Sequence, residues 1–393
     1  MQVSERKSAS LSKKNTENPT LRKGLYSALF CAYYVFVINR IVSFNISNDG
    51  FRFGDWLINY SQGFVRRGLL GNIFIVLKTS FNVPLVLSLS IFEGLALAFV
   101  FYFVWSLIVS KPHNVWLTLL VFSPIGFFYT LNEFRYAGLK EILFIAFLGL
   151  VYYFKEYPIK SFQFALLIAL WMTVIFSHEG LIFFIGYPIA ILFLATKSRQ
   201  GIKAKIITFV SSSAVSAAII YLFGFAKSNS QALCQKLLEF GEVASSACSG
   251  SIKWLQFDTK FGMQYVAHAL NARFLSVYIF FALIALALGF LTVRSSFGDK
   301  RKIYVFLLLS WLLACPLFAI GTDWGRWIYI HSTSIMILLL ILRKDQTEPK
   351  EFKLQTLKTE FLLGILWLFS MSVTLGGGHV IVPILRAWHF FQN

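Results

Sequence analysis

One stretch of this sequence sets charged and amide side chains among aromatic residues: FRFGDWLINYSQGFVRRGLLG, from Phe51 to Gly71. Its Arg66 and Arg67 are adjacent, and a guanidinium presents a planar fork of N–H donors that fits a phosphate or a carboxylate. Its Asp55 is suited to act as a general base that takes a proton from a hydroxyl group. Structural interpretations also stay open: Asp55 as a helix N-cap or a local partner for Arg52, and the arginine pair as an anchor in lipid headgroups.

Three further short segments pair carboxylates with cationic or imidazole side chains. The turn SHEG holds His178 and Glu179 between two apolar segments, and partial burial would raise a carboxylate pKa toward the working range of a general base. A structural pair at a helix end is the alternative for these two residues. Asp323 and Arg326 are three residues apart, which also fits a simple ion pair. The segment NEFRY adds Arg135 beside another carboxylate.

Composition decides what kind of protein must position these residues. The chain has 393 residues, of which 57% are apolar and 14% charged, and its mean hydropathy is +0.68. These values are typical of a polytopic membrane protein and not of a soluble one. A formal net charge of +18 would indicate nucleic acid as the partner of a soluble protein. Here the bias of basic residues toward cytoplasmic loops explains it, and we predict no nucleic-acid partner.

We predict an all-α fold with about eleven membrane-spanning helices, within a range of ten to twelve, because a span needs about 20 apolar residues, or about 17 when short. The predicted spans are 25–43, 83–109, 114–131, 139–154, 161–177, 180–196, 206–226, 273–293, 303–320, 327–342 and 360–376. The segment from Leu69 to Ser80 is too short, since about 12 helical residues rise only about 18 Å. We therefore predict an interfacial helix there.

Basic residues predict which side of the membrane each loop faces. Residues 1–24 form a basic tail, and most of the remaining Lys and Arg lie in short loops between spans. The positive-inside rule makes this tail and these loops cytoplasmic. The transmembrane domain, 25–376, then leaves on the periplasmic side the loop 44–82, the larger loop 227–272, and a tail, 377–393, that is periplasmic or interfacial.

This topology puts all the candidate residues on the outer face. The positive-inside rule does not explain arginines there, so their clustering predicts an anionic ligand held at the outer leaflet. The turns that contain Glu179 and Asp323 lie between short apolar segments, which places them below the membrane surface. Irregular backbone at that depth must be buried in protein or line a water-filled cavity. We therefore predict an outward-open cavity.

The positions of the cysteines and the absence of several motifs limit the kinds of reaction that the protein could catalyse. Cys234 and Cys248 both fall in the larger outer loop, 14 residues apart, where an oxidising periplasm allows a disulfide. The sequence has no Walker loop, no dinucleotide fingerprint, no HExxH and no Cys pairs at zinc spacing. We accordingly predict no metal and no cofactor, and no role driven by nucleotides or redox chemistry.

The architecture resembles that of a known group of enzymes. An eleven-span chain rich in Phe, Ile and Leu, with one larger outer loop in its second half and arginines at the outer mouth, looks like bacterial O-antigen polymerases of the Wzy type. More loosely, it is similar to membrane glycosyltransferases of the GT-C type, which have an Asp or Glu in the outer loop after the first span, as Asp49 and Asp55 are here. The resemblance covers the whole chain.

What the resemblance implies is an inner-membrane enzyme that polymerises undecaprenyl-pyrophosphate-linked oligosaccharide repeat units at the periplasmic face, making O-antigen or capsule. Its partners would be the lipid-linked substrate, membrane lipids and a chain-length regulator protein. The implied pyrophosphate-binding residues are Arg66, Arg67, Arg135 and Arg326, and the implied catalytic residues are Asp55, His178, Glu179 and Asp323. Enough converging cations would stabilise the leaving group without a metal.

Two other functions remain open. In a GT-C transferase that moves a single sugar from polyprenyl phosphate, an outer-loop carboxylate such as Asp55 could also bind a divalent metal. In a flippase or transporter of lipid-linked oligosaccharides, the arginines would line a substrate path. A transporter should need charges deep in several spans, and here only Glu93 lies deep in one.

Overall fold

The computed structural model describes residues 19–110, 113–154, 161–196, 201–224, 229–270, 274–344, 357–373 and 380–381. Over these residues the chain is helical, apart from one short antiparallel pair, β1 (Ser372–Val373) and β2 (Val380–Ile381), in which Ser372 lies opposite Ile381. The predicted all-α class is therefore confirmed. Of the predicted outer tail 377–393, only 380–381 are described.

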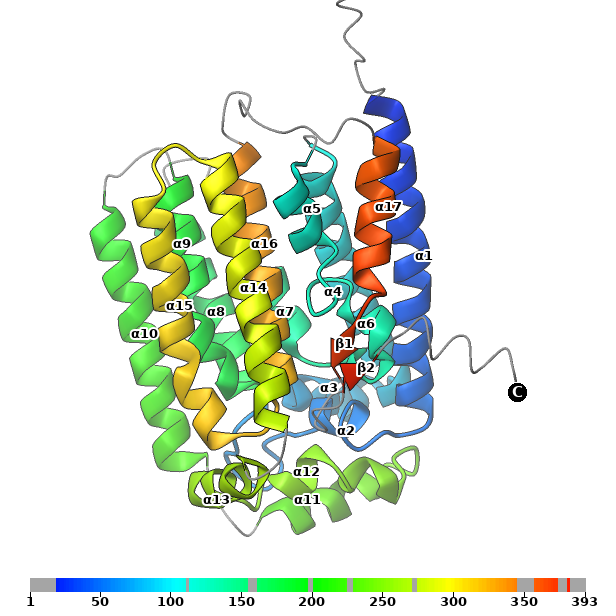
Figure 1. Cartoon of the computed structure of the whole chain (residues 1–393). Helices are drawn as coiled ribbons and strands as arrows, with labels where there is room; N and C mark the ends of the chain where they lie inside the picture. The colour runs from blue at the N-terminus through cyan, green and yellow to red at the C-terminus, as the bar shows by residue number, and fades with distance from the viewer. Residues whose placement is uncertain are drawn as a thin grey trace, which may run out of the picture.

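Among the residues that the structure describes, six helices are long and apolar enough to cross a membrane, since 20 or more residues rise about 30 Å. They are α1 (Pro19–Ile46), α4 (Leu85–Ile108), α10 (Ile202–Phe223), α14 (Phe274–Ser296), α15 (Arg301–Ile320) and α16 (Trp324–Lys344). These helices run side by side through the bundle (Figure 1). Nearly all of α16 is buried, whereas α4, α10 and α15 expose large apolar side chains. The central helix is thus α16, and the others present apolar faces suited to lipid.

Shorter helices fill the space between the long ones. They are α5 (Val115–Val121), α6 (Tyr129–Asn132), the 3-10 helix η1 (Phe134–Tyr136), α7 (Glu141–Phe154), α8 (Ser161–Ser177), the 3-10 helix η2 (Glu179–Phe184), α9 (Gly186–Ala195) and α17 (Leu357–Leu368). Each of them is shorter than the six candidate spans. The six long helices are fewer than the eleven predicted spans, because several apolar segments are split or cut short.

Three of the predicted spans are not continuous α-helices. The segment 114–131 forms α5 and the start of α6, and Pro124 lies between them, because the residue before a proline avoids helical backbone. The segment 360–376 forms α17, which ends at Leu368 and leads into β1. The predicted span 180–196 begins as the 3-10 turn η2 and becomes α-helical only from Gly186. An apolar run alone does not show where a helix stops.

The first helix extends beyond the predicted span 25–43 on its N-terminal side. It begins at Pro19, a residue type favoured in the first helical turn, so residues 19–24 of the predicted tail are helical and continuous with α1. Arg22 is buried, and its guanidinium donates two hydrogen bonds of 2.9 Å to Glu360 on α17. Tyr26 and His113 contact the same carboxylate. This cluster joins α1 to α17. Residues 1–18 lie outside the described part.

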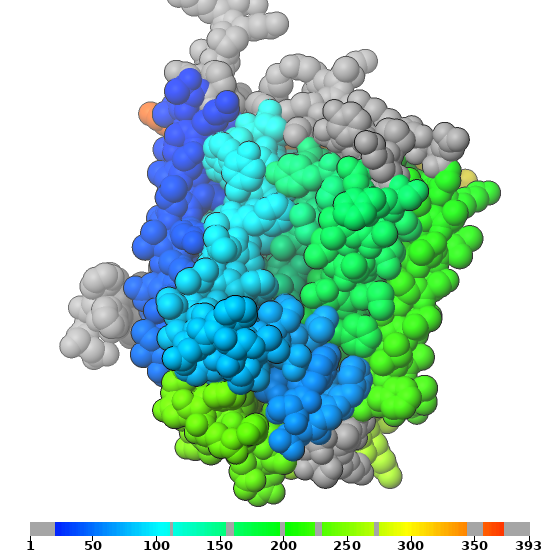
Figure 2. All heavy atoms as spheres, turned by 180° about the vertical axis from the view of Figure 1, so that it is seen from behind, coloured from blue at the N-terminus to red at the C-terminus, as the bar shows by residue number. Residues whose placement is uncertain are grey.

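A cap of short helices closes the end of the bundle opposite the start of α1 (Figure 1). It comprises α2 (Phe53–Trp56), α3 (Leu69–Phe81), α11 (Asn229–Leu238), the 3-10 helix η3 (Ser245–Cys248), α12 (Ser251–Trp254) and α13 (Thr259–Leu270). From behind, the blue loop after α1 and the yellow-green segment pack directly against each other (Figure 2). The predicted outer loops therefore lie together, and a disulfide joins Cys234 to Cys248 within the second one.

The cap has its own hydrophobic core, separate from that of the bundle. Phe53, Trp56 and Phe74 pack there with Leu233 and Leu237 of α11. The helix predicted between Leu69 and Ser80 is α3, which buries Leu70 and Phe74 and leaves Ile73, Val76 and Phe81 exposed. An apolar face left exposed beside the membrane-spanning helices fits the predicted interfacial position.

Candidate active site

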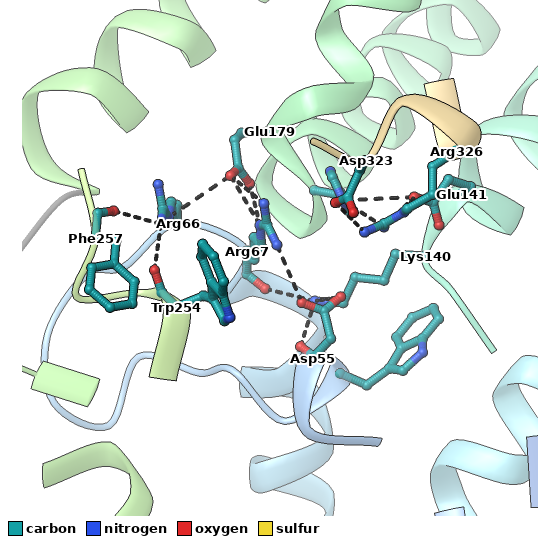
Figure 3. A network of polar contacts seen from close by, with 12 residues as sticks. Asp55, Arg66, Arg67, Lys140, Glu141, Glu179, Trp254, Phe257, Asp323 and Arg326 are labelled. Atoms are coloured by element: carbon teal, nitrogen blue, oxygen red, sulfur yellow. Dashed lines mark hydrogen bonds and ion pairs between the residues drawn. The ribbon is translucent and has the colours of Figure 1, made fainter. Parts of the chain in front are cut away.

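Residues from five separate segments meet where the cap joins the bundle (Figure 3). The segments are the loop after α1, the start of α7, the turn between α8 and η2, the start of α16, and the α12–α13 connection. The members are Asp55, Arg66, Arg67, Lys140, Glu141, His178, Glu179, Asp323 and Arg326, together with the backbone carbonyls of Trp254 and Phe257. We call this set the mouth network.

The exposed edge of the mouth network is an arginine–carboxylate fork. Arg67 Nε lies 2.8 Å from Glu179 Oε2, and Arg67 Nη2 lies 2.8 Å from Glu179 Oε1. The backbone of Arg67 is left-handed, with φ of +68°, which costs a non-glycine residue about 1–2 kcal/mol. Lys140 Nζ donates to the Arg67 carbonyl at 3.2 Å and helps to hold this conformation. The turn thus fixes the guanidinium in front of Glu179.

Asp55 lies beneath this fork, between two cations. Its Oδ1 is 3.7 Å from Arg67 Nη1, and its Oδ2 is 3.5 Å from Lys140 Nζ. Burial pushes the pKa of Asp55 up, but the charges of Lys140 and Arg67 outweigh it, and the pKa falls below its ordinary value. Asp55 is therefore ionised at neutral pH. The N-cap interpretation is wrong, because Arg52 occupies the N-cap of α2 and pairs with Asp49.

Lys140 was not predicted as a site residue, and it organises the centre of the mouth network. Its side chain is fully buried, and Nζ donates to the Asp55 carbonyl at 2.8 Å. The ammonium also lies over the Trp56 ring, 5.6 Å from its centroid. A buried lysine of this kind needs Asp55 as its counter-ion.

Arg326 links α16 to three other site residues. Its Nε donates to Glu141 Oε1 at 2.7 Å, its Nη2 donates to the same oxygen, and its Nη1 lies 2.9 Å from Asp323 Oδ2. The ion pair predicted between Asp323 and Arg326 is thus present. Arg326 Nη2 also lies 3.2 Å from His178 Nε2. A guanidinium can only donate, so this imidazole nitrogen accepts and the ring proton is on Nδ1. His178 Nε2 is occupied and is a poor base.

The other two predicted pyrophosphate ligands, Arg66 and Arg135, also have partners. Arg66 Nη2 donates to the carbonyls of Trp254 and Phe257, at 3.0 and 3.1 Å, and its Nε is 3.9 Å from Glu179. It therefore fastens the cap to the network while staying near the fork. Arg135 pairs with Glu133 at 2.7 Å, and its contacts do not include the mouth network. The structure brings together Arg66, Arg67 and Arg326, and it leaves Arg135 apart.

Exposure divides the mouth network into an outer and an inner layer. The side chains of Glu179, Arg67 and Asp323 are 22, 24 and 46% exposed, so a ligand can reach them. Asp55, Lys140, Glu141 and His178 are at most 5% exposed and support the outer residues from beneath. Arg67 and Arg326 are each matched by carboxylates within hydrogen-bonding distance. An entering anion must therefore compete with a resident carboxylate.

A small cavity lies behind the inner layer. Its volume is about 40 Å³, and its walls include Glu141, Glu93, Tyr33, Tyr136 and Tyr329. This is enough for two or three water molecules, since one needs roughly 10–15 Å³ of such volume. Glu141 Oε2 and the Tyr136 hydroxyl have no hydrogen-bond partner in the described structure, so water suits them. Glu93 accepts a bond from Asn45 at 2.8 Å. Glu93 therefore faces this cavity and is held by Asn45.

Sequence reasoning missed Lys140 and Glu141 although a signal existed. Both lie at the outer end of the predicted span 139–154, followed by the apolar run ILFIAFLGL. Two adjacent ionisable residues at the edge of a membrane span are candidates for function by default. No three His, Cys, Asp or Glu side chains are grouped to hold a metal ion in the part of the chain that the structure describes.

The fold and the site together define an all-helical, multi-pass membrane protein with a charged network at one end of its bundle. The model of one family, the uncharacterised membrane protein Rv1490, matches residues 24–253, which is more than half of the chain. This chain therefore belongs to the Rv1490 family of membrane proteins. The matched region contains Asp55, Arg67, Lys140 and Glu179, whereas Arg326 lies beyond it. No curated protein and no solved structure matches the chain.

Proposed function

We propose that this protein is a glycosyltransferase of the bacterial inner membrane that polymerises undecaprenyl-pyrophosphate-linked oligosaccharide repeat units. The observation that carries the proposal is the mouth network itself. Guanidinium groups suited to a pyrophosphate and carboxylates suited to accept a proton converge there from segments as distant in sequence as Asp55 and Arg326. Such convergence is typical of sites that stabilise a charged leaving group.

The proposed orientation has the N-terminus in the cytoplasm, about eleven membrane passes counting the short helices, and the cap in the periplasm. The connection between α14 and α15, at the end opposite the cap (Figure 1), contains Lys300 and is flanked by Arg294, Arg301 and Lys302, which supports this orientation through the positive-inside rule. The disulfide between Cys234 and Cys248 fits an oxidising compartment. A lipid-linked substrate would then approach within the outer leaflet and reach the network below the cap.

The chemistry would be a single displacement at a sugar carbon. A hydroxyl oxygen of the acceptor unit forms a bond to the anomeric carbon of the donor, and the bond from that carbon to the pyrophosphate oxygen breaks. The pyrophosphate leaves with the bonding electron pair, and Arg67, Arg66 and Arg326 stabilise its charge. The hydroxyl proton passes to a carboxylate.

The exposure and the contacts of the predicted carboxylates indicate which of them is the base. Glu179 is partly exposed and lies against the arginines, where a reacting hydroxyl would meet it. Asp55 is almost fully buried, so its role is to position Arg67 and Lys140. Asp323 is the most exposed of the three and holds Arg326. His178 would orient Arg326, because its Nε2 accepts from that guanidinium.

One observation favours the transfer of a single sugar as a second candidate. Asp55 lies in the loop directly after the first long helix and at the centre of the network, which is the place of the acidic residue in GT-C-type enzymes. The lipid carrier and the direction of proton transfer would be similar in both cases. The two functions differ in the size of the group transferred and in the leaving group, which is a lipid phosphate for the single sugar and a lipid pyrophosphate for the repeat unit.

The deciding experiment compares surface polysaccharide on a gel from cells with and without this chain. A polymerase predicts that its loss replaces the ladder of polymer lengths by a single capped repeat unit. An unchanged ladder would refute polymerisation, and a ladder of altered mobility would favour the single-sugar transferase. Loss of all polymer would favour a flippase. Complementation links the result to the site. The wild-type chain is compared with Arg67→Lys, which keeps the positive charge but lacks the two-pronged guanidinium group.

A further inference from the structure

The cationic seat that a phosphate would use already contains an anion. Both oxygens of Glu179 bind the Arg67 fork, at 2.8 to 3.0 Å, and Glu179 Oε1 is 3.9 Å from Arg66 Nε. Two oxygens facing two guanidinium groups are the arrangement that a phosphate would adopt there. We call Arg66 and Arg67, with the space in front of them, the anion seat.

The arginines of the anion seat cannot follow Glu179 if it moves away. Arg66 is held by two carbonyls of the cap, and Arg67 is held by Asp55 and by the Lys140 contact to its carbonyl. Glu179 begins the 3-10 helix η2 directly after the irregular backbone of His178, and its side chain is 22% exposed. The carboxylate is therefore the partner that can leave, and the seat keeps its shape.

We propose that Glu179 is the resident anion of this seat, and that a phosphate-bearing ligand binds by displacing it. Under the proposed glycosyltransferase function, on which this second step rests, the ligand is the donor pyrophosphate. The displaced carboxylate loses its cationic partners and becomes a stronger base beside the reacting hydroxyl, because opposite charges favour the ionised form of an acid. Donor binding would thus activate the base.

The exchange also determines which anions bind. A singly charged anion that replaces Glu179 gains no net attraction, since it takes over the same charge and must leave water. A pyrophosphate brings more negative charge and can contact Arg66 and Arg67 at once. The seat should therefore select multiply charged phosphates over chloride or acetate.

The test measures binding of inorganic pyrophosphate to the purified full chain in detergent by titration calorimetry. Glu179→Gln removes the resident charge and should tighten binding by about tenfold or more, which is about 1.4 kcal/mol. Adding Arg67→Gln to that variant should abolish this gain in affinity for pyrophosphate. Glu239→Gln is the matched control, because Glu239 pairs with Lys236 on the exposed face of α11 and should leave binding unchanged.

Unchanged or weaker pyrophosphate binding by Glu179→Gln would overturn the proposal, and so would a Glu239→Gln variant that binds as tightly as Glu179→Gln. If the Gln variant does not fold, Glu179→Asp serves instead, since its shorter side chain cannot reach the fork and should also tighten binding. The calorimetry measures binding alone and does not depend on catalytic activity. Tighter pyrophosphate binding by a variant that still gives a wild-type polysaccharide ladder would support the seat and refute Glu179 as the base.

Discussion

Replacing the buried Lys140 by methionine tests whether the mouth network is held together as described. The methionine has nearly the same length and fills the same space, so the change removes the charge and the donors with little effect on packing. It leaves the Asp55 carboxylate buried with Arg67 Nη1, 3.7 Å away, as its remaining cation. The carbonyls of Asp55 and Arg67 also lose their Nζ donor.

The expected cost follows from the burial of the pair. Removing one partner of a buried ion pair destabilises a protein by about 3–5 kcal/mol, because the other charge stays buried and loses part of its compensation. At about 2 °C for each kcal/mol in a large domain, the unfolding midpoint should fall by roughly 6–10 °C. The double variant Lys140→Met with Asp55→Asn leaves no uncompensated charge and should recover a large part of this loss.

The assay is thermal unfolding of the purified protein in one detergent, with Lys236→Met as the control. Lys236 pairs with Glu239 on the surface, where both side chains are about half exposed, and such pairs contribute at most about 1 kcal/mol. The reasoning is refuted if Lys140→Met unfolds at the wild-type temperature. It is equally refuted if the double variant unfolds at a lower temperature than Lys140→Met by as much as an independent destabilising substitution would cause.

Three other predictions concern the cavity, the disulfide and the cap. Glu93→Gln should lower the thermal unfolding midpoint only slightly, by less than about 1 kcal/mol in stability, because a buried carboxyl without a cationic partner is neutral and an amide can keep the contact to Asn45. Replacing Cys234 and Cys248 by serine should cost about 3 kcal/mol in thermal stability, the value expected for a closed loop of about 15 residues. Gly54→Ala should disrupt the cap and replace the ladder of polymer lengths by a single capped repeat unit, because the added carbon would lie 2.1 Å from the Ala247 carbonyl oxygen.

Two of these three predictions have a control variant within the chain, and the third has an outcome that would contradict it. For the glycine, Gly298→Ala has open space around the added carbon and should leave synthesis unchanged. For the disulfide, serine at the free cysteines Cys31 and Cys315 should not reproduce the effect. For the cavity, a large loss of stability in Glu93→Gln would mean that Glu93 is ionised and paired.

The sequence determined the class of the protein and most of the helix positions. Hydropathy sums over neighbouring residues, so the long apolar runs that form α1, α4, α10, α14, α15 and α16 could be recognised without tertiary information. The same reasoning predicted that Glu179, Asp323 and the arginines share one side of the membrane, since loops between successive spans alternate between its faces. It also identified the helix α3 by its length.

Which of those residues meet was decided by the tertiary structure. Nothing in the local pattern distinguishes Arg135, which pairs with its neighbour Glu133, from Arg67, which pairs with Glu179 in a distant turn. Lys140 looked like the edge of a span and became the buried counter-ion of Asp55. Hydropathy is a property of a segment, whereas an ion pair is a property of two segments in space, and only packing brings the two together.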